Sequence, residues 1–288
     1  MTKSCFALPA LLLALTVAPV QAAPALWSIS DEDSTVWLFG SFHLLPPSLE
    51  WRTELFDETL EKADVVYFET DVGPAAQATL GARSFELGLR DDGKFLAQVL
   101  DPEDADLLRS VSAQYAVPMP LLNTLKPWLA ELTLTASIAQ QAGLDPNSGV
   151  DILLQREIPA ERQAYFETGE EQLGFLANAS DEDQTAMLIS TLEQVGSTSK
   201  MLSKMISAWR EGTPEKFAPY FLAEMSGPQT SMLDRIIYQR NERWAVTIEG
   251  LLAENKEALI VVGAGHMVGD RGVQALLEDA GLEVRRLQ

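Results

Sequence analysis

Two short apolar runs near opposite ends of the chain each lead into the pattern Gly-x-x-His. The run Val36–Phe39 leads to His43, and the run Ala258–Val262 leads to His266. Their length and their β-branched or aromatic residues predict two buried strands. The two histidines, the only ones in the sequence, therefore follow the carboxyl ends of strands, where open α/β sheets bind ligands. We predict that both imidazoles face one site; the alternative is two unrelated histidines on surface loops.

Further strands are predicted around these two runs. Leu26–Ile29 and Thr35–Phe39 flank a polar turn, which is typical of an antiparallel hairpin. A third apolar run, Asp64–Phe68, ends at Glu69, and a carboxylate at the end of a buried strand must be paired, hydrogen-bonded or bound to metal. The alternative for Glu69 is a solvated acid at a helix N-terminus. The last strand is predicted at Leu282–Leu287, after a helix.

The middle of the chain has mostly helical periodicity. Pro102 and Pro127 have the position that proline takes in the first turn of a helix. We predict an α/β fold: a central mixed β-sheet is built from the N- and C-terminal segments, with a large, mostly helical insertion. The core covers about residues 26–74 and 160–288, and the insertion about 75–160.

Two further polar residues are candidates for the site. The tetrapeptide Tyr-Phe-Glu-Thr occurs at 67–70 and again at 165–168, so Glu167 is a second carboxylate at a predicted strand end. The second copy continues into a capping box from Thr168 to Glu171, which predicts a helix start. Arg240 lies in the amphipathic helix predicted over Ser231–Glu254 and either covers a helix face or points into the site.

The N-terminus has the three parts of a secretory signal peptide. Lys3 supplies the positive charge, Phe6–Val20 is the apolar region, and small residues follow. We predict a signal peptide over residues 1–22, with cleavage after Ala22, and a domain over 23–288. The apolar region is short for a membrane anchor, and no later run matches it. We therefore expect a periplasmic or extracellular protein, without a stable membrane span after cleavage.

The amino-acid composition limits the classes of partner that the protein could bind. The net charge of −21, with a pI near 4.4, argues against binding to nucleic acid or to anionic membranes, because such binding needs clustered Lys and Arg. Cys5, the only cysteine, is removed with the signal peptide. The mature chain then has no disulfide, zinc thiolate or cysteine nucleophile. No nucleophile elbow, phosphate-binding loop or His-Glu-x-x-His motif is present.

Taken together, these motifs resemble those of the TraB/GumN family, whose animal relatives include the Tiki proteins. The resemblance runs from about Leu26 to the end of the chain and rests on these segments: Gly40–Pro46, Phe68–Thr70, Lys126–Trp128, Phe166–Gln172, Arg240–Trp244 and Val262–His266. It implies an α/β core related to the haem-binding ChaN and erythromycin-esterase folds, and a metal-dependent hydrolase. Tiki relatives are regarded as metalloproteases that use manganese or cobalt.

By position, His43, Glu69, Arg240 and His266 match the polar residues of the family's motifs, and we predict that they are catalytic. His43, Glu69 and His266 could hold a divalent metal and leave a position open for water, with Glu167 as a further ligand or outer partner. Nitrogen and oxygen ligands suit Mn, Co or Zn without selecting among them.

The roles of these residues leave alternatives open. Glu69 could be a ligand or a general base, and Arg240 could stabilise an oxyanion. Ser41 as a nucleophile with His266 as its base is a weaker alternative. At the level of function, the first hypothesis is an exported metal-dependent hydrolase acting on peptide bonds. The others are a non-catalytic protein that binds haem or a small ligand, and an interaction protein of the cell envelope.

Overall fold

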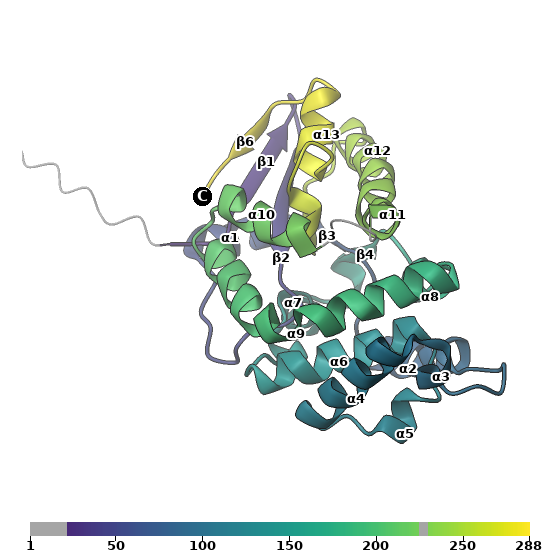
Figure 1. Ribbon diagram of the computed structural model, residues 1–288. Coiled ribbons are helices and arrows are strands. Elements are labelled where there is room, and N and C mark those ends of the chain that lie inside the picture. Colours follow the sequence, from purple (N-terminus) through teal and green to yellow (C-terminus); the bar gives the residue numbers. More distant parts are fainter. Residues whose placement is uncertain (1–21, 225–229) are drawn as a thin grey trace, which may run out of the picture.

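The computed structural model describes residues 22–224 and 230–288 (Figure 1). The predicted signal peptide, apart from its last residue, lies outside the described residues. The described part contains a six-stranded mixed sheet in the order β4-β3-β5-β2-β1-β6. Its strands are β1 (Leu26–Ser30), β2 (Thr35–Ser41), β3 (Val65–Phe68), β4 (Gln163–Tyr165), β5 (Ala258–Gly263) and β6 (Val284–Arg286).

The pairing of the strands brings the two Gly-x-x-His motifs together. β2 and β5 are parallel neighbours, with Gly40 opposite Val262 and Ser41 opposite Gly263. β3 runs parallel to β5 on its other side, so the end of β3 joins the same edge of the sheet. The predicted hairpin is confirmed, because β1 pairs with β2 in antiparallel register.

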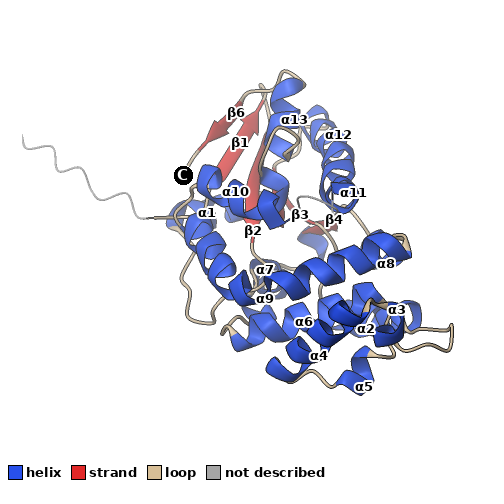
Figure 2. Ribbon diagram, in the orientation of Figure 1, coloured by secondary structure: helices blue, strands red, loops and turns tan. Residues whose placement is uncertain are grey.

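The predicted α/β fold with a helical insertion is confirmed (Figure 2). The helices are α1 (Glu54–Lys62), α2 (Pro74–Gly88), α3 (Leu96–Val99), α4 (Pro102–Gln114), α5 (Met119–Leu122), α6 (Pro127–Gln141), α7 (Val150–Glu157), α8 (Gly169–Ala177), α9 (Asp181–Arg210), α10 (Pro214–Glu224), α11 (Thr230–Leu233), α12 (Gln239–Ala253) and α13 (Val273–Asp279). Helices α2 to α6 form a layer apart from the sheet, in the lower part of Figure 2. None of the helices in the described ranges combines the length and apolar content that a membrane span requires.

The two faces of the sheet bury different side chains, as the alternation of a strand requires. In β5, Leu259 and Val261 join a core that includes Trp51, Phe56 and Trp209. Ile260 and Val262 join the opposite core, which includes Trp244 and Ile248 of α12. Both faces of this central strand are therefore covered, and the functional groups gather at its end.

Helix α9 connects the insertion to the sheet. Its first half contributes Leu188 and Leu192 to the core of the insertion. Its last turns contribute Ile206 and Trp209 to the core on the sheet. One helix of 30 residues thus packs against both layers.

Local signals explain where several helices begin. Pro102 and Pro127 occupy the first turns of α4 and α6, as predicted. The predicted capping box at the start of α8 is present, with Thr168 and Glu171 bonded reciprocally. The helix predicted over Ser231–Glu254 is present but is interrupted by a π-helical turn, Asp234–Tyr238. Such turns are frequent at functional sites.

Candidate functional site

The carboxyl ends of β2, β3 and β5 open into a cavity of about 290 Å³. Both Gly-x-x-His motifs line it, together with Glu69, Arg240 and side chains from α9, α10 and the π-helical turn. His43 and His266 therefore lie on one pocket, although 223 positions separate them in a chain of 288 residues. The alternative of two unrelated surface histidines is excluded.

Gly263 marks the point where the polar groups meet. A Cβ atom at this position would lie 3.1 Å from Glu69 Oε1, 3.2 Å from His43 Nε2 and 3.7 Å from His266 Cδ2. The backbone of Gly263 has φ −50° and ψ 138°, which other residues adopt freely. The absence of a side chain, rather than conformational freedom, is therefore what the site needs here.

His43 is oriented by a carboxylate that the sequence analysis missed. Its Nδ1 lies 2.7 Å from Asp151 Oδ2, and the Ser41 hydroxyl donates to Asp151 Oδ1 at 2.8 Å. The Asp151 carboxylate raises the pKa of His43 to about 9. Because Asp151 holds Nδ1–H, the Nε2 atom is the one that faces the pocket.

Asp151 lies in the first turn of α7, and the chain around it is fastened to the first motif. The Val150 N–H donates to the Phe42 carbonyl at 3.0 Å, and a Cβ at Gly149 would overlap the backbone of His43. One signal was available in the sequence, namely a single acid in the first turn of an apolar helix directly after a glycine. That pattern is equally typical of an acid that interacts with the helix dipole.

His266 lies in a short 3₁₀ turn after β5 and is 3% exposed. Its Nδ1 lies 2.5 Å from Asn241 Oδ1, which makes Nδ1 the protonated nitrogen. Its Nε2 accepts from Arg240 Nη1 at 3.2 Å. Burial lowers the pKa of His266 to about 3, so the ring is neutral. Asn241, which fixes this tautomer, was also missed by the sequence analysis.

Glu69 is buried at the end of β3 and ionised. Its Oε1 accepts from the Gly263 N–H at 2.7 Å. Its Oε2 accepts from Arg240 Nη2 at 2.5 Å and from Gln172 Nε2 at 3.1 Å. Burial by itself raises the pKa of Glu69, but the neighbouring His266, Arg240 and His43 together with the Gly263 N–H outweigh burial and hold the pKa well below its usual range.

Arg240 is held on several sides. Besides the bonds to Glu69 and His266, its Nε donates to Glu167 at 2.9 Å and its Nη1 to the Ile236 carbonyl at 2.8 Å. Its guanidinium carbon lies 4.7 Å from the centre of the Trp244 ring. These bonds occupy four of the five N–H donors of a guanidinium. Arg240 thus points into the site, and most of its donors already serve its neighbours.

Glu167 lies behind Arg240. Its carboxylate bonds Arg240 Nε and Arg243 Nη2, and its side chain is 4% exposed. It lines a separate groove, together with Arg243, rather than the pocket of the two histidines. Glu167 is predicted from the sequence to be either a further metal ligand or an outer partner of the ligands. Its position behind Arg240 agrees with an outer partner and does not agree with a metal ligand.

The donor atoms fit a divalent cation in part. His43 Nε2 and Glu69 Oε1 approach the same point, and an acceptor orients the far nitrogen of His43, as is usual for a ligating histidine. In the described part of the chain, however, no group of three or more His, Cys, Asp or Glu is arranged to hold a metal ion. The expected third ligand, His266, shares its Nε2 with Arg240. His43 and Glu69 thus contribute two donor atoms, and the Nε2 of His266 is occupied by Arg240 in this arrangement.

The alternative nucleophile does not have the required partner. The Ser41 hydroxyl donates to Asp151. The base proposed for it, His266, has its two ring nitrogens bonded to Asn241 and Arg240. A Ser41–His266 pair is therefore not formed in this arrangement.

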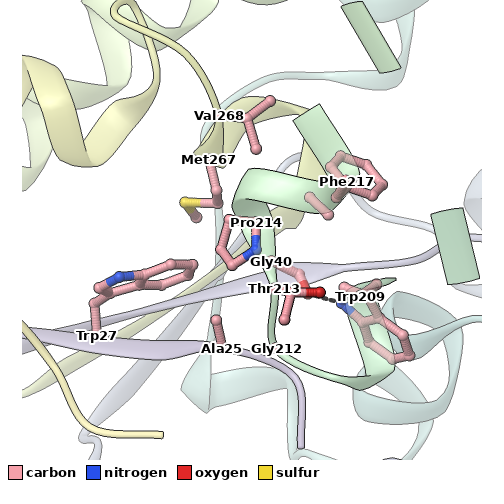
Figure 3. A pocket seen from close by; sticks show the side chains of 11 residues that line it. Ala25, Trp27, Gly40, Trp209, Gly212, Thr213, Pro214, Phe217, Met267 and Val268 are labelled. Atoms are coloured by element: carbon pink, nitrogen blue, oxygen red, sulfur yellow. Dashed lines mark hydrogen bonds between the residues drawn. The ribbon is translucent and has the colours of Figure 1, made fainter. Parts of the chain in front are cut away.

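A second, much smaller cavity is lined by Gly40 and shares Phe217 and Ala264 with the pocket of the two histidines (Figure 3). Its volume is about 20 Å³, and Trp27, Phe217 and Met267 are among its mainly apolar lining side chains. The Trp209 Nε1–H donates to the Gly40 carbonyl at 2.7 Å, so this polar pair is already satisfied. A space of this size holds about one water molecule and offers it few partners. It is a packing gap rather than a binding site.

Sequence comparison finds relatives of this chain among known proteins. The protein YbaP of Escherichia coli (strain K12), which is described as uncharacterized, is 22% identical over 245 residues, covering 83% of this chain and 86% of YbaP. A protein named metalloprotease TIKI homolog, from Amphimedon queenslandica, is 41% identical over 58 residues, which is 19% of this chain and 11% of that protein. No solved structure gives a significant match. The profile of the TraB/PrgY/gumN family matches residues 25–286, and the chain therefore belongs to this family.

Proposed function

We propose that this protein is a metal-dependent hydrolase that cleaves peptide bonds in the pocket of the two histidines. The observation that carries the proposal is the approach of His43 Nε2 and Glu69 Oε1 to one point above Gly263. A nitrogen and an ionised oxygen that meet at the floor of a cavity are suited to a divalent cation. The name of the sponge relative supports a metalloprotease, over the 58 residues that it shares with this chain.

In this proposal each polar residue has a distinct task. His43 and Glu69 hold the metal, which when bound would lower the pKa of a water molecule and polarise the substrate carbonyl. Asp151 holds His43 through Nδ1 with Nε2 toward the pocket, and a metal bound there would displace the Nε2 proton. Arg240 keeps Glu69 ionised through its bond to Oε2. Asn241 keeps Nε2 of His266 unprotonated, so this ring can accept a hydrogen bond or join the ligands.

The low pKa of Glu69 bears on its role. A carboxylate that remains ionised far below neutral pH is a weak base but a good anionic ligand. Of the two predicted roles for Glu69, ligand and general base, we therefore propose that of ligand. Mn, Co and Zn all accept imidazole and carboxylate, and the donor set does not choose among them.

The test measures metal binding and hydrolysis separately. Mn²⁺, Co²⁺ and Zn²⁺ are titrated into the purified protein by calorimetry, and bound metal is counted after gel filtration. We expect one ion per chain, lost in His43→Ala and Glu69→Gln and retained in Glu157→Gln, a control on the far end of α7. Peptide cleavage should follow metal content. Unchanged metal binding in both site variants would overturn the proposal, and a visible absorption band on titration with haem would favour the ligand-binding alternative.

We also propose that the protein is exported. The basis is the sequence of residues 1–22, with its charged start, apolar stretch and small residues before the cleavage point. Sequencing the N-terminus of the protein recovered from a bacterial periplasm tests this, and Ala23 is the expected first residue. A protein that keeps Met1 in the cytoplasmic fraction would contradict it.

A further inference from the structure

The pocket has two halves of opposite character. Its polar floor carries the ionisable groups, and these are already balanced, since Glu69 pairs with Arg240 and His43 with Asp151. Its wall is apolar and comes from the last turns of α9, from α10 and from the π-helical turn. This apolar wall consists of Leu202, Met205, Phe217, Phe221, Ile236 and Ile237.

The apolar wall is held in place by packing against the motifs. Phe217 and Phe221 stack with their ring centres 5.8 Å apart and their planes 15° apart. Phe42 of the first motif meets Phe217 edge to face at 6.1 Å. A Cβ at Gly265 of the second motif would overlap the Phe221 ring, so this glycine provides the space that Phe221 occupies. The wall and the polar floor are therefore positioned by the same two motifs.

Several side chains of the apolar wall are only partly covered by the protein. Leu202, Phe221 and Ile236 have intermediate exposure although they are large and apolar. Scattered exposed apolar residues are ordinary, but a continuous apolar surface beside a polar centre is typical of a ligand pocket. An apolar group that enters would remove this surface from water, whereas a charged group would lose its hydration and find on the wall no side chain to pair with.

Resting on the hydrolase function proposed above, we propose that the substrate residue next to the cleaved peptide bond carries an aliphatic or aromatic side chain that packs against the apolar wall. The cavity of about 290 Å³ sets the scale. This lies at the lower end of the range of small-ligand pockets, about 300–1,000 Å³. That is room for one large apolar side chain and the adjoining peptide group.

The first experiment measures binding rather than cleavage. Blocked peptides acetyl-Ala-X-Ala-amide, with X as Leu, Phe, Asp or Lys, are titrated into the full-length mature protein and followed by ligand-detected NMR. We expect the Leu and Phe peptides to bind at least about tenfold more tightly than the Asp and Lys peptides, the range of discrimination typical of an apolar pocket.

A matched pair of variants places this preference on the wall. Leu202→Lys puts an ammonium group at a partly exposed position of the pocket, and Ser203→Lys puts the same group on the neighbouring, exposed position of α9. We expect Leu202→Lys to weaken binding of the Leu peptide about tenfold or more and to strengthen binding of the Asp peptide. Ser203→Lys should bind the four peptides in the same order of affinity as the wild type. Circular dichroism checks that both variants fold.

Cleavage of the same peptides separates this inference from the proposed function. An apolar preference in binding without any cleavage would support the apolar subsite and overturn the hydrolase. Cleavage without an apolar preference would support the hydrolase and overturn the apolar subsite. Equal binding of the four peptides, or no measurable binding of any of them, would overturn the subsite.

Discussion

His43 Nδ1 lies 2.7 Å from Asp151 Oδ2, and this pair joins the first Gly-x-x-His motif to the first turn of α7. The second oxygen of Asp151 accepts the Ser41 hydroxyl at 2.8 Å. A single buried carboxylate therefore orients both polar side chains of the motif. It decides which nitrogen of His43 faces the pocket, and this is the property that a metal ligand or a base requires.

The charge of Asp151 should be measurable at His43. Asp151→Asn keeps an oxygen that can accept from Nδ1–H and removes the negative charge. We expect the pKa of His43 to fall from about 9 toward the ordinary value of 6.5. An NMR titration of the ring protons measures it, and the sequence has only two histidines to assign if the purification tag contains none.

The control for this titration lies on the same helix. Glu157 is half exposed and pairs with Arg52, away from His43. In Glu157→Gln the titration of His43 should stay as in the wild type. A His43 that titrates identically in Asp151→Asn and in the wild type would show that the carboxylate does not set its protonation.

The two histidines should give the stability of the protein opposite dependences on pH. His43 has a raised pKa, so the folded state binds more protons than the unfolded state between about 6.5 and 9, and its stabilising contribution is lost as pH rises through that window. His266 has a pKa lowered to about 3, so the unfolded state binds the extra proton and stability falls as pH drops from 6.5 toward 3.

Urea unfolding at a series of pH values measures both dependences. We expect His43→Gln to have a smaller loss of unfolding free energy between pH 7 and 9 than the wild type. Because 61% of the His43 side chain is exposed, solvent screens its pair with Asp151 and the effect should be modest. A variant as sensitive to alkaline pH as the wild type would show that His43 is not the group responsible.

The sheet and the meeting of the histidines could be predicted because both depend on local patterns. Two apolar runs that each end in Gly-x-x-His need only be parallel neighbours for His43 and His266 to meet, and β2 and β5 have that pairing. Glu69 follows from the same rule, since β3 is parallel to β5. Proline and capping residues gave the starts of α4, α6 and α8 for similarly local reasons.

The partners of these residues could not be predicted, because they depend on contacts between distant segments. Asp151 reaches His43 across 108 positions of the sequence. Arg240 meets Glu167 across 73 positions and depends on the π-helical turn for its bond to the Ile236 carbonyl. A single insertion in the helical pattern cannot be recognised from periodicity, so the orientation of Arg240 stayed open.

Replacing Arg240 should destabilise the folded protein more than replacing its neighbour Arg243. Its side chain is 7% exposed and bonded to Glu69 and Glu167, so Arg240→Met leaves two buried carboxylates without their main partner. Removing one member of a buried pair destabilises a protein by about 3–5 kcal/mol. We expect a loss of that order in the free energy of unfolding, measured by urea denaturation.

The comparison variants test the reason for that loss. Arg243→Met removes a side chain that is 53% exposed, and we expect a change of about 1 kcal/mol or less. Arg240→Lys keeps the charge but not the planar fork, so an intermediate loss is expected. If Arg240→Met and Arg243→Met were equally stable, the guanidinium would not be compensating buried charge.

Gly263 should be required for ligand binding more than for folding. The Cβ of Gly263→Ala would lie 3.1 Å from Glu69 Oε1 and 3.2 Å from His43 Nε2, inside the space where those atoms meet. Because the backbone there suits any residue, the free energy of unfolding should change by no more than about 1–3 kcal/mol, the usual effect of overpacking. Binding of Mn²⁺, measured by calorimetry, should weaken at least about tenfold, which is about 1.4 kcal/mol.

The control for this substitution is Gly250→Ala in α12. That glycine is exposed, and a Cβ there would meet nothing within 4 Å. Replacing a glycine inside a helix by alanine stabilises the helix by about 1 kcal/mol. We therefore expect Gly250→Ala to be more stable than the wild type and to bind Mn²⁺ equally well. Equal Mn²⁺ binding by Gly263→Ala and Gly250→Ala would mean that the ion lies elsewhere, because a methyl group at Gly263 cannot share the space between Glu69 and His43 with a metal.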